Sequence, residues 1–197
     1  MKGTATPFGF PLLFFCLVSL LVLPPYFAIV GINGITWWLL ATILLSSLYL
    51  VANNRRQLLL GIILALPTLG LNLFRELFDF QVSPYLSNML YVAFFAYIEV
   101  FLVRYFLLTK QVTADMIFAA MCAYIILGLA WMFIYSCIEL REPASFVVSH
   151  TGSSPVDILQ FLYFSFVTLT TLGYGDVTPI TDFARSWTIL EAILGQF

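Results

Sequence analysis

The sequence predicts an all-α integral membrane protein, and three observations lead to this fold class. Of the 197 residues, 62% are apolar and only 9% are charged, whereas a soluble domain carries about a quarter charged residues. The apolar residues gather in runs of 15 to 25 residues, which are too long for membrane β-strands of about ten residues and suit helices. The polar connections between these runs are short, so neighbouring helices are expected to run antiparallel, with no room for a soluble domain.

Taken in order, the first four runs are expected to form an amino-terminal region of four membrane spans over residues 1–110. Its spans are predicted at 8–30, 35–52, 57–74 and 85–108. No small-residue cleavage site follows the first run, so it is interpreted as a retained span that ends or kinks at Pro24-Pro25 rather than as a signal peptide. Residues 111–197 form the second region, which opens with a fifth span at 114–138.

Charge placement sets the orientation and excludes several classes of protein. The positive-inside rule favours a cytoplasmic amino terminus, because five of the eight basic residues then lie inside: Lys2, Arg55, Arg56, Arg104 and Lys110. A net charge of −2 with scattered basic residues offers no surface for nucleic acid. No nucleophile-and-base constellation is present, so an enzyme is not expected. The cysteines, Cys16, Cys122 and Cys137, lie in apolar runs without ligand spacing and are interpreted as packing residues.

The stretch from 139 to 185 breaks the apolar pattern. A polar loop at 139–154 precedes a run at 155–170 that is too short to cross a bilayer, so this helix is expected to enter the membrane partway, capped by Ser154 or Asp157. A non-helical stretch with two glycines follows at membrane depth. Irregular backbone is tolerated there only where protein buries it or where it lines a water-filled pathway.

Residues Thr171-Leu172-Gly173-Tyr174-Gly175 resemble the selectivity filter of potassium channels. The resemblance extends upstream over 163–170, which is similar to the pore helix of bacterial six-span potassium channels, and downstream over Asp176-Val177-Thr178-Pro179, which is similar to their outer mouth. It implies a pore module in residues 111–197, comprising an outer helix (114–138), an extracellular loop (139–154), a pore helix (155–170), a filter (171–176) and an inner helix (183–197). Because one chain supplies one filter loop, the resemblance implies a homotetramer of this chain with three identical subunits.

The resemblance also implies roles for individual residues. Potassium would bind the carbonyls of the filter, and the support of the filter is assigned to Tyr163, Phe164, Thr170 and Asp176. The ion-binding residues are Thr171, with its hydroxyl, Leu172, Gly173, Tyr174 and Gly175. We expect the Tyr174 ring to pack on Tyr163, Phe164 and Phe166.

Three departures from the family pattern lead to further expectations. Leu172 replaces the commoner Val or Ile and is expected to preserve selectivity. Val167 stands where some relatives have a glutamate, so Asp176 is expected to find another partner, the Tyr163 hydroxyl. The fourth span has one Arg, Arg104, where voltage sensors carry several, so no conventional voltage sensor is expected.

The last helix has 15 residues, about 23 Å at 1.5 Å per residue. It resembles a truncated inner helix that ends after Gly195, a candidate gating hinge. Within the spans, Glu99 needs a partner in Arg104 or Arg75, or a proton, and a pH-sensing role stays open, while Glu191 is interpreted as structural. His150 is expected to be solvated, as are Glu139, Arg141 and Glu142, which would form a rim.

The predicted function is passive, potassium-selective permeation through a multi-pass protein of the plasma (inner) membrane. No cofactor is expected beyond the permeant ion, and the partners are potassium, the lipid bilayer and copies of this chain. Two alternatives stay open: a non-conducting membrane subunit, and a component of a potassium uptake transporter.

Overall fold

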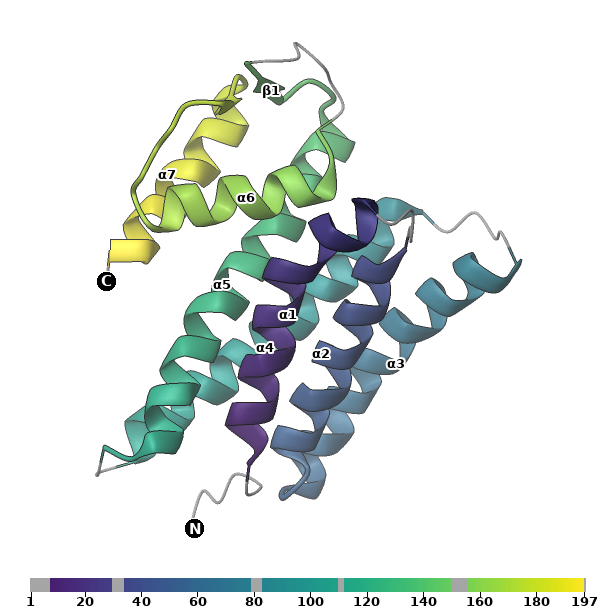
Figure 1. Ribbon diagram of the computed structural model, residues 1–197, viewed down its shortest axis with the longest axis vertical. Helices are drawn as coiled ribbons and strands as arrows, with labels where there is room; N and C mark the ends of the chain where they lie inside the picture. Colours follow the sequence, from purple (N-terminus) through teal and green to yellow (C-terminus); the bar gives the residue numbers. More distant parts are fainter. Residues whose placement is uncertain (1–7, 30–33, 79–82, 110–111, 150–155, 197) are drawn as a thin grey trace. The chain divides into compact units, whose positions relative to one another are not determined.

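The computed structural model describes residues 8–29, 34–78, 83–109, 112–149 and 156–196. Within these ranges the chain forms seven helices and two short strands (Figure 1). The helices are α1 (Gly9–Ile29), α2 (Ile35–Val51), α3 (Arg55–Phe78), α4 (Pro84–Leu108), α5 (Ala114–Arg141), α6 (Ile158–Leu169) and α7 (Asp182–Gln196). The strands β1 (Phe146–Val148) and β2 (Val177–Pro179) pair antiparallel, with Val147 opposite Thr178.

Length and composition make four helices able to cross a membrane, namely α1, α3, α4 and α5. Helix α2 has 17 residues, the lower limit for a span, and α6 with 12 residues is too short. The predicted all-α membrane fold is therefore confirmed.

The chain divides into two compact units, and the division does not fall at residue 110. One unit comprises residues 1–81 and 93–126, and the other comprises 82–92 and 127–197. Helices α4 and α5 pass through both units, because each is long enough to pack on different neighbours at its two ends. We call the first the amino-terminal unit and the second the filter unit, after the predicted filter segment that it contains.

The amino-terminal unit is packed chiefly through apolar and aromatic side chains. Helices α1, α2 and α3 follow one another as neighbours (Figure 1). The Phe10 ring lies 4.8 Å from that of Tyr105, and the Tyr97 hydroxyl donates to the Gln57 carbonyl at 2.6 Å, which joins α4 to α3.

The first predicted span agrees with α1, but the third and fifth end a few residues later than predicted. Pro24 and Pro25 do not end the first helix, which continues to Ile29. Helix α3 continues to Phe78, into the predicted connection after Arg75, and α5 continues through Glu139 to Arg141. The reason is the same for α3 and α5: a charged residue marks where a helix leaves the apolar layer, and the helix itself does not have to end there. His150 and Ser154 lie outside the described residues.

Candidate functional site

Helix α6 begins at a capping box and carries the site on its carboxyl end. Asp157 is the N-cap, with extended backbone, and its N–H donates to Gln160 Oε1 at 2.9 Å. The reciprocal pair satisfies amides that the first helical turn leaves without partners. The expected cap at Asp157 is confirmed.

One face of α6 packs in an aromatic cluster formed by Tyr135, Phe146, Phe161 and Phe164. The ring centroids of Phe146 and Phe161 lie 5.1 Å apart, and those of Tyr135 and Phe164 lie 5.1 Å apart. All four side chains are buried. The cluster fixes α6 against α5 and the loop that follows it, because large rings that meet edge to face bury much apolar area in a defined geometry.

The predicted filter segment leaves the helix at Thr170 and is tied back to it by its own amides. The N–H of Thr171 donates to the Thr168 carbonyl at 2.9 Å, and the N–H groups of Leu172 and Gly173 donate to the Val167 carbonyl at 3.0 and 3.3 Å. The Thr170 hydroxyl donates to the Phe166 carbonyl at 2.6 Å. The donors of the segment thus point to α6 and stabilise its non-helical backbone.

The backbone of this segment requires left-handed conformations at three positions. The φ angles are +58° at Thr171, +57° at Gly173 and +75° at Gly175. Glycine adopts such angles without a steric penalty, whereas a β-branched residue such as threonine is strained there by about 1–3 kcal/mol. Strain of this kind is kept where the surrounding structure over-determines the backbone, and it is typical of functional sites.

Four carbonyl oxygens of the segment have no hydrogen-bond donor within the described part of the chain. Among the described residues, no hydrogen bond is donated to the carbonyl oxygens of Thr171, Leu172, Gly173 or Tyr174. These residues are exposed in the single chain, Leu172 by 58% and Tyr174 by 67%. Four consecutive carbonyls without internal donors form a set of hard oxygen ligands suited to a cation.

The outer end of the segment is braced by two contacts. The Gly175 carbonyl accepts a hydrogen bond from the Ser149 hydroxyl at 3.1 Å, and the Asp176 carbonyl accepts one from the Ser149 N–H at 2.8 Å. Gly175 therefore differs from the four residues before it, because its carbonyl already has a donor.

The expected contact between Tyr163 and Asp176 is present. The Tyr163 hydroxyl forms a hydrogen bond with the Asp176 carboxyl group, and this bond is the main reason that the pKa of Tyr163 rises to about 12. The Asp176 carboxylate also accepts the N–H of Val177 at 3.0 Å. Tyr163 thereby links the middle of α6 to the outer end of the filter segment.

The expected packing of the Tyr174 ring on Phe164 is wrong for the single chain. Among the described residues, the Tyr174 ring has no ring partner, and Phe164 packs on Tyr135 and Phe146 instead. Tyr163, by contrast, is 42% exposed, and Tyr174 is among the groups that raise its pKa.

The solvated rim that we predicted at Glu139, Arg141 and Glu142 is wrong for Glu139. Glu139 is only 6% exposed, and its two oxygens accept the N–H groups of Ala144 at 2.9 Å and Phe146 at 3.2 Å. Arg141 and Glu142 are exposed, although the Arg141 guanidinium lies 5.6 Å from the Phe183 ring centroid. Sequence reasoning missed strand β1, although the run Phe146-Val147-Val148 has the composition of a strand.

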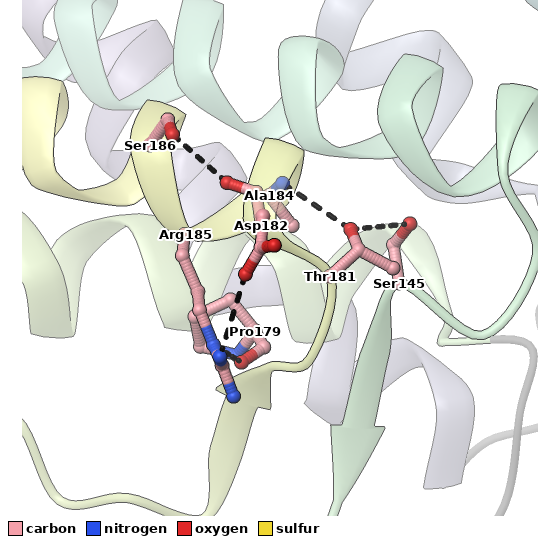
Figure 2. Close-up of polar contacts among 7 residues, drawn as sticks. All are labelled: Ser145, Pro179, Thr181, Asp182, Ala184, Arg185 and Ser186. Carbon is pink, nitrogen blue, oxygen red and sulfur yellow. Dashed lines mark hydrogen bonds and ion pairs between the residues drawn. The ribbon is translucent and has the colours of Figure 1, made fainter.

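The start of α7 is fixed to the same loop (Figure 2). The Thr181 hydroxyl accepts the N–H of Ala184 at 3.3 Å, as a helix cap does, and it donates to the Ser145 hydroxyl at 3.3 Å. Ser145 also accepts the N–H of Ile180 on its carbonyl at 2.7 Å. The ion pair of Arg185 with Asp182, at 3.7 Å, is exposed and adds little.

Further along α7, Glu191 and Gly195 face α6. Glu191 is fully buried and hydrogen-bonded to Ser165, which agrees with a structural interpretation. A Cβ at Gly195 would lie 2.4 Å from the Leu169 carbonyl oxygen. The residue predicted as a hinge is therefore, in this structure, a point of close approach between two backbones.

In the amino-terminal unit, Glu99 does not pair with Arg104, one of the two partners considered for it. Its Oε2 atom is buried without a hydrogen bond among the described residues, and the exposed Arg104 makes no ion pair with it in this part of the chain. The side chain of Arg75 is outside the described set. Nor do the described residues bring together three or more side chains able to bind a metal ion.

Comparison with known proteins matches one segment of the chain to a protein family. Residues 119–196 match the protein-family model described as an ion channel. No curated protein and no solved structure matches the chain. The matched segment includes most of α5, all of α6, the free carbonyls and α7, and the match supports an ion channel rather than an enzyme.

Proposed function

We propose that the chain is a subunit of a potassium-selective channel, through which ions pass down their gradient without chemical turnover. The observation that carries the proposal is the row of four carbonyls, Thr171 to Tyr174, which accept no hydrogen bond among the described residues, while the amides of the first three residues of the row are held by α6. A potassium ion that leaves water needs oxygens to replace its hydration shell, and such carbonyls supply them.

In this proposal each part of the site has a separate task. The carbonyls of residues 171–174 and the Thr171 hydroxyl bind the ion. The Val167 carbonyl and Thr170 hold the inner end of the segment, and Ser149 and Tyr163 hold the outer end. Binding at several adjacent oxygens keeps each site weak enough for the ion to leave.

Four copies are needed to surround an ion, so we propose a homotetramer with the filter segments on its symmetry axis. The exposure of Leu172 and Tyr174 supports this assembly, because side chains of their size are expected to find cover. The Tyr174 ring would then lie against a neighbouring subunit. We also propose that the amino terminus faces the cytoplasm of a plasma (inner) membrane, on the distribution of basic residues.

Ion flux from liposomes that contain the purified full chain tests the function. We expect efflux of potassium that barium blocks and that falls sharply when sodium replaces potassium. Flux without selectivity, or a monomeric mass in mild detergent, would contradict the proposal.

A glycine substitution in the filter segment makes the test specific. In Gly173→Ala the new Cβ meets no atom of the described residues within 4 Å, so its effect comes from the positive φ, which costs a non-glycine residue about 1–2 kcal/mol. Selective flux should be lost while membrane insertion persists. Gly70→Ala, in open space on α3, is the matched control and should conduct normally.

A further inference from the structure

Three elements of the filter unit meet at a buried polar cluster that the proposed permeation path does not use. We call it the Glu191 cluster; it comprises Tyr135 and the Gly128 carbonyl of α5, Ser165 of α6 and Glu191 of α7. Ser165 Oγ lies 2.5 Å from Glu191 Oε1 and 3.0 Å from the Gly128 carbonyl oxygen. The Tyr135 hydroxyl is hydrogen-bonded to Glu191 Oε2. Ser165 and Glu191 have no exposed surface.

If all three contacts in the cluster are hydrogen bonds, the number of available protons fixes the protonation state of Glu191. Three hydrogen bonds join its oxygens, but the hydroxyls of Ser165 and Tyr135 supply only two protons. If Ser165 donates to Gly128, its short contact with Glu191 Oε1 needs a proton from the carboxyl group. A protonated Glu191 that donates to Ser165 and accepts from Tyr135 satisfies all three bonds.

The surroundings of Glu191 agree with a neutral acid. Within the described ranges, no lysine or arginine forms an ion pair with it, and Arg185, the basic residue of α7, pairs with the exposed Asp182. A buried carboxylate without a cation would lose its hydration and gain no Coulomb partner in return.

The cluster lies one turn from the end of α6 that holds the filter segment. Glu191 and Gly195 are four residues apart on α7, and so are their partners Ser165 and Leu169 on α6, so two successive turns of each helix are in register. Between these partners lies Val167, whose carbonyl accepts the amides of Leu172 and Gly173.

We propose that Glu191 is a positioning residue of the filter: as a neutral acid it joins α7 to α6 and α5 and so sets where α6 presents the carbonyls of residues 171–174. The proposal rests on the proposed function only for its flux measurement, because the protonation state can be measured without conduction.

Infrared spectroscopy of the full chain in liposomes tests the protonation state. The difference spectrum between the wild type and Glu191→Gln should show the carbonyl stretch of a protonated carboxylic acid at neutral pH. Glu142→Gln, at an exposed glutamate, is the control and should show carboxylate bands. Carboxylate bands for Glu191 as well would overturn the proposal, even if potassium flux is selective.

Selectivity tests the positioning role. The amide of Glu191→Gln can donate to Ser165 and accept from Tyr135, so the potassium-over-sodium flux ratio should stay within about twofold of the wild type. Glu191→Ala removes both bonds and should lower the ratio about tenfold or more. Ser165→Ala, which is less disruptive, should lower the ratio in the same direction. An equal loss of the flux ratio in Glu191→Gln and Glu191→Ala would overturn the positioning role. Absence of flux in the wild type would instead contradict the proposed function, and the infrared result would then decide on the protonation state of Glu191.

Discussion

The two units of the chain use their buried polar groups differently. In the amino-terminal unit, Ser46 and Thr68 donate to carbonyls of their own helices, at Ile43 and Leu64. In the filter unit, Glu139 and Ser165 bond to groups on other elements. The bond from Tyr97 to Gln57 is a cross-helix tie of the amino-terminal unit, so the difference is one of degree.

The physical reason lies in the backbone of each unit. A membrane helix satisfies its own amides and carbonyls, so α1, α2 and α3 need only side-chain packing to associate. The filter unit contains backbone outside helices, at β1, β2 and residues 170–176. Such backbone keeps one geometry only if other elements hold it, and buried polar bonds do this with directional precision.

The largest difference in stability and flux between variants of the two units should appear when one methyl group is added to a helical glycine. In Gly195→Ala the new Cβ would meet the Leu169 backbone at 2.4 Å, whereas in Gly70→Ala it meets nothing within 4 Å. We expect Gly195→Ala to destabilise the protein by about 3 kcal/mol and to abolish selective flux. Gly70→Ala should be neutral or slightly stabilising.

Thermal unfolding in detergent and liposome flux measure both variants. If Gly195→Ala unfolds like the wild type and conducts normally, the close approach of α7 to α6 is not needed for stability or for selective flux.

A second contrast concerns the two buried glutamates of the filter unit. Glu139 accepts two backbone N–H groups, so it needs two acceptor oxygens, and the amide of Glu139→Gln offers only one. We expect Glu139→Gln to lose about 1–3 kcal/mol, close to Glu139→Ala, because a buried donor is left unsatisfied.

Unfolding measurements on both variants, beside Glu191→Gln, check this contrast. Full stability of Glu139→Gln would show that one oxygen is enough to hold the loop.

The bond between Tyr163 and Asp176 predicts a smaller, kinetic effect. Tyr163→Phe removes the hydroxyl but keeps the ring, so assembly and selectivity should persist while current in bilayers decays several-fold faster, since about 1 kcal/mol of hydrogen bonding corresponds to about fivefold. Tyr124→Phe, on α5, is the control for loss of a tyrosine hydroxyl. An unchanged rate of decay would refute the bracing role of Tyr163.

The smallest effect is expected at Glu99, in the amino-terminal unit. Since Glu99 Oε2 has no hydrogen-bond partner among the described residues, Glu99→Gln should change stability by less than about 1 kcal/mol and leave flux at neutral pH unchanged. Flux measured across a pH series is the informative experiment. If Glu99→Gln removes a pH dependence that the wild type shows, the acid has a sensing role and the two units are coupled.

The expected backbone of the segment and the cap of α6 were correct, because local sequence decides both. Thr171 to Gly175 carries its glycines where positive φ is required, and Asp157 with Gln160 is a local capping signal. The expectations for Glu139 and Tyr174 were wrong, because burial of one and exposure of the other depend on which elements pack around them. Charge alone does not show that a glutamate at a helix end accepts amides from the following loop.

The sequence by itself determined the membrane environment, the helices and the position of the non-helical segment, because hydrophobic runs and glycine placement act within a few residues along the chain. Only the tertiary structure decided which carbonyls of the segment have no donor, which face of α6 the aromatic cluster fills and which hydroxyls meet Glu191. These features join residues up to 56 positions apart, as Tyr135 and Glu191 are. Pairing over such distances depends on helix packing in three dimensions, and a one-dimensional pattern does not encode it in any local signal.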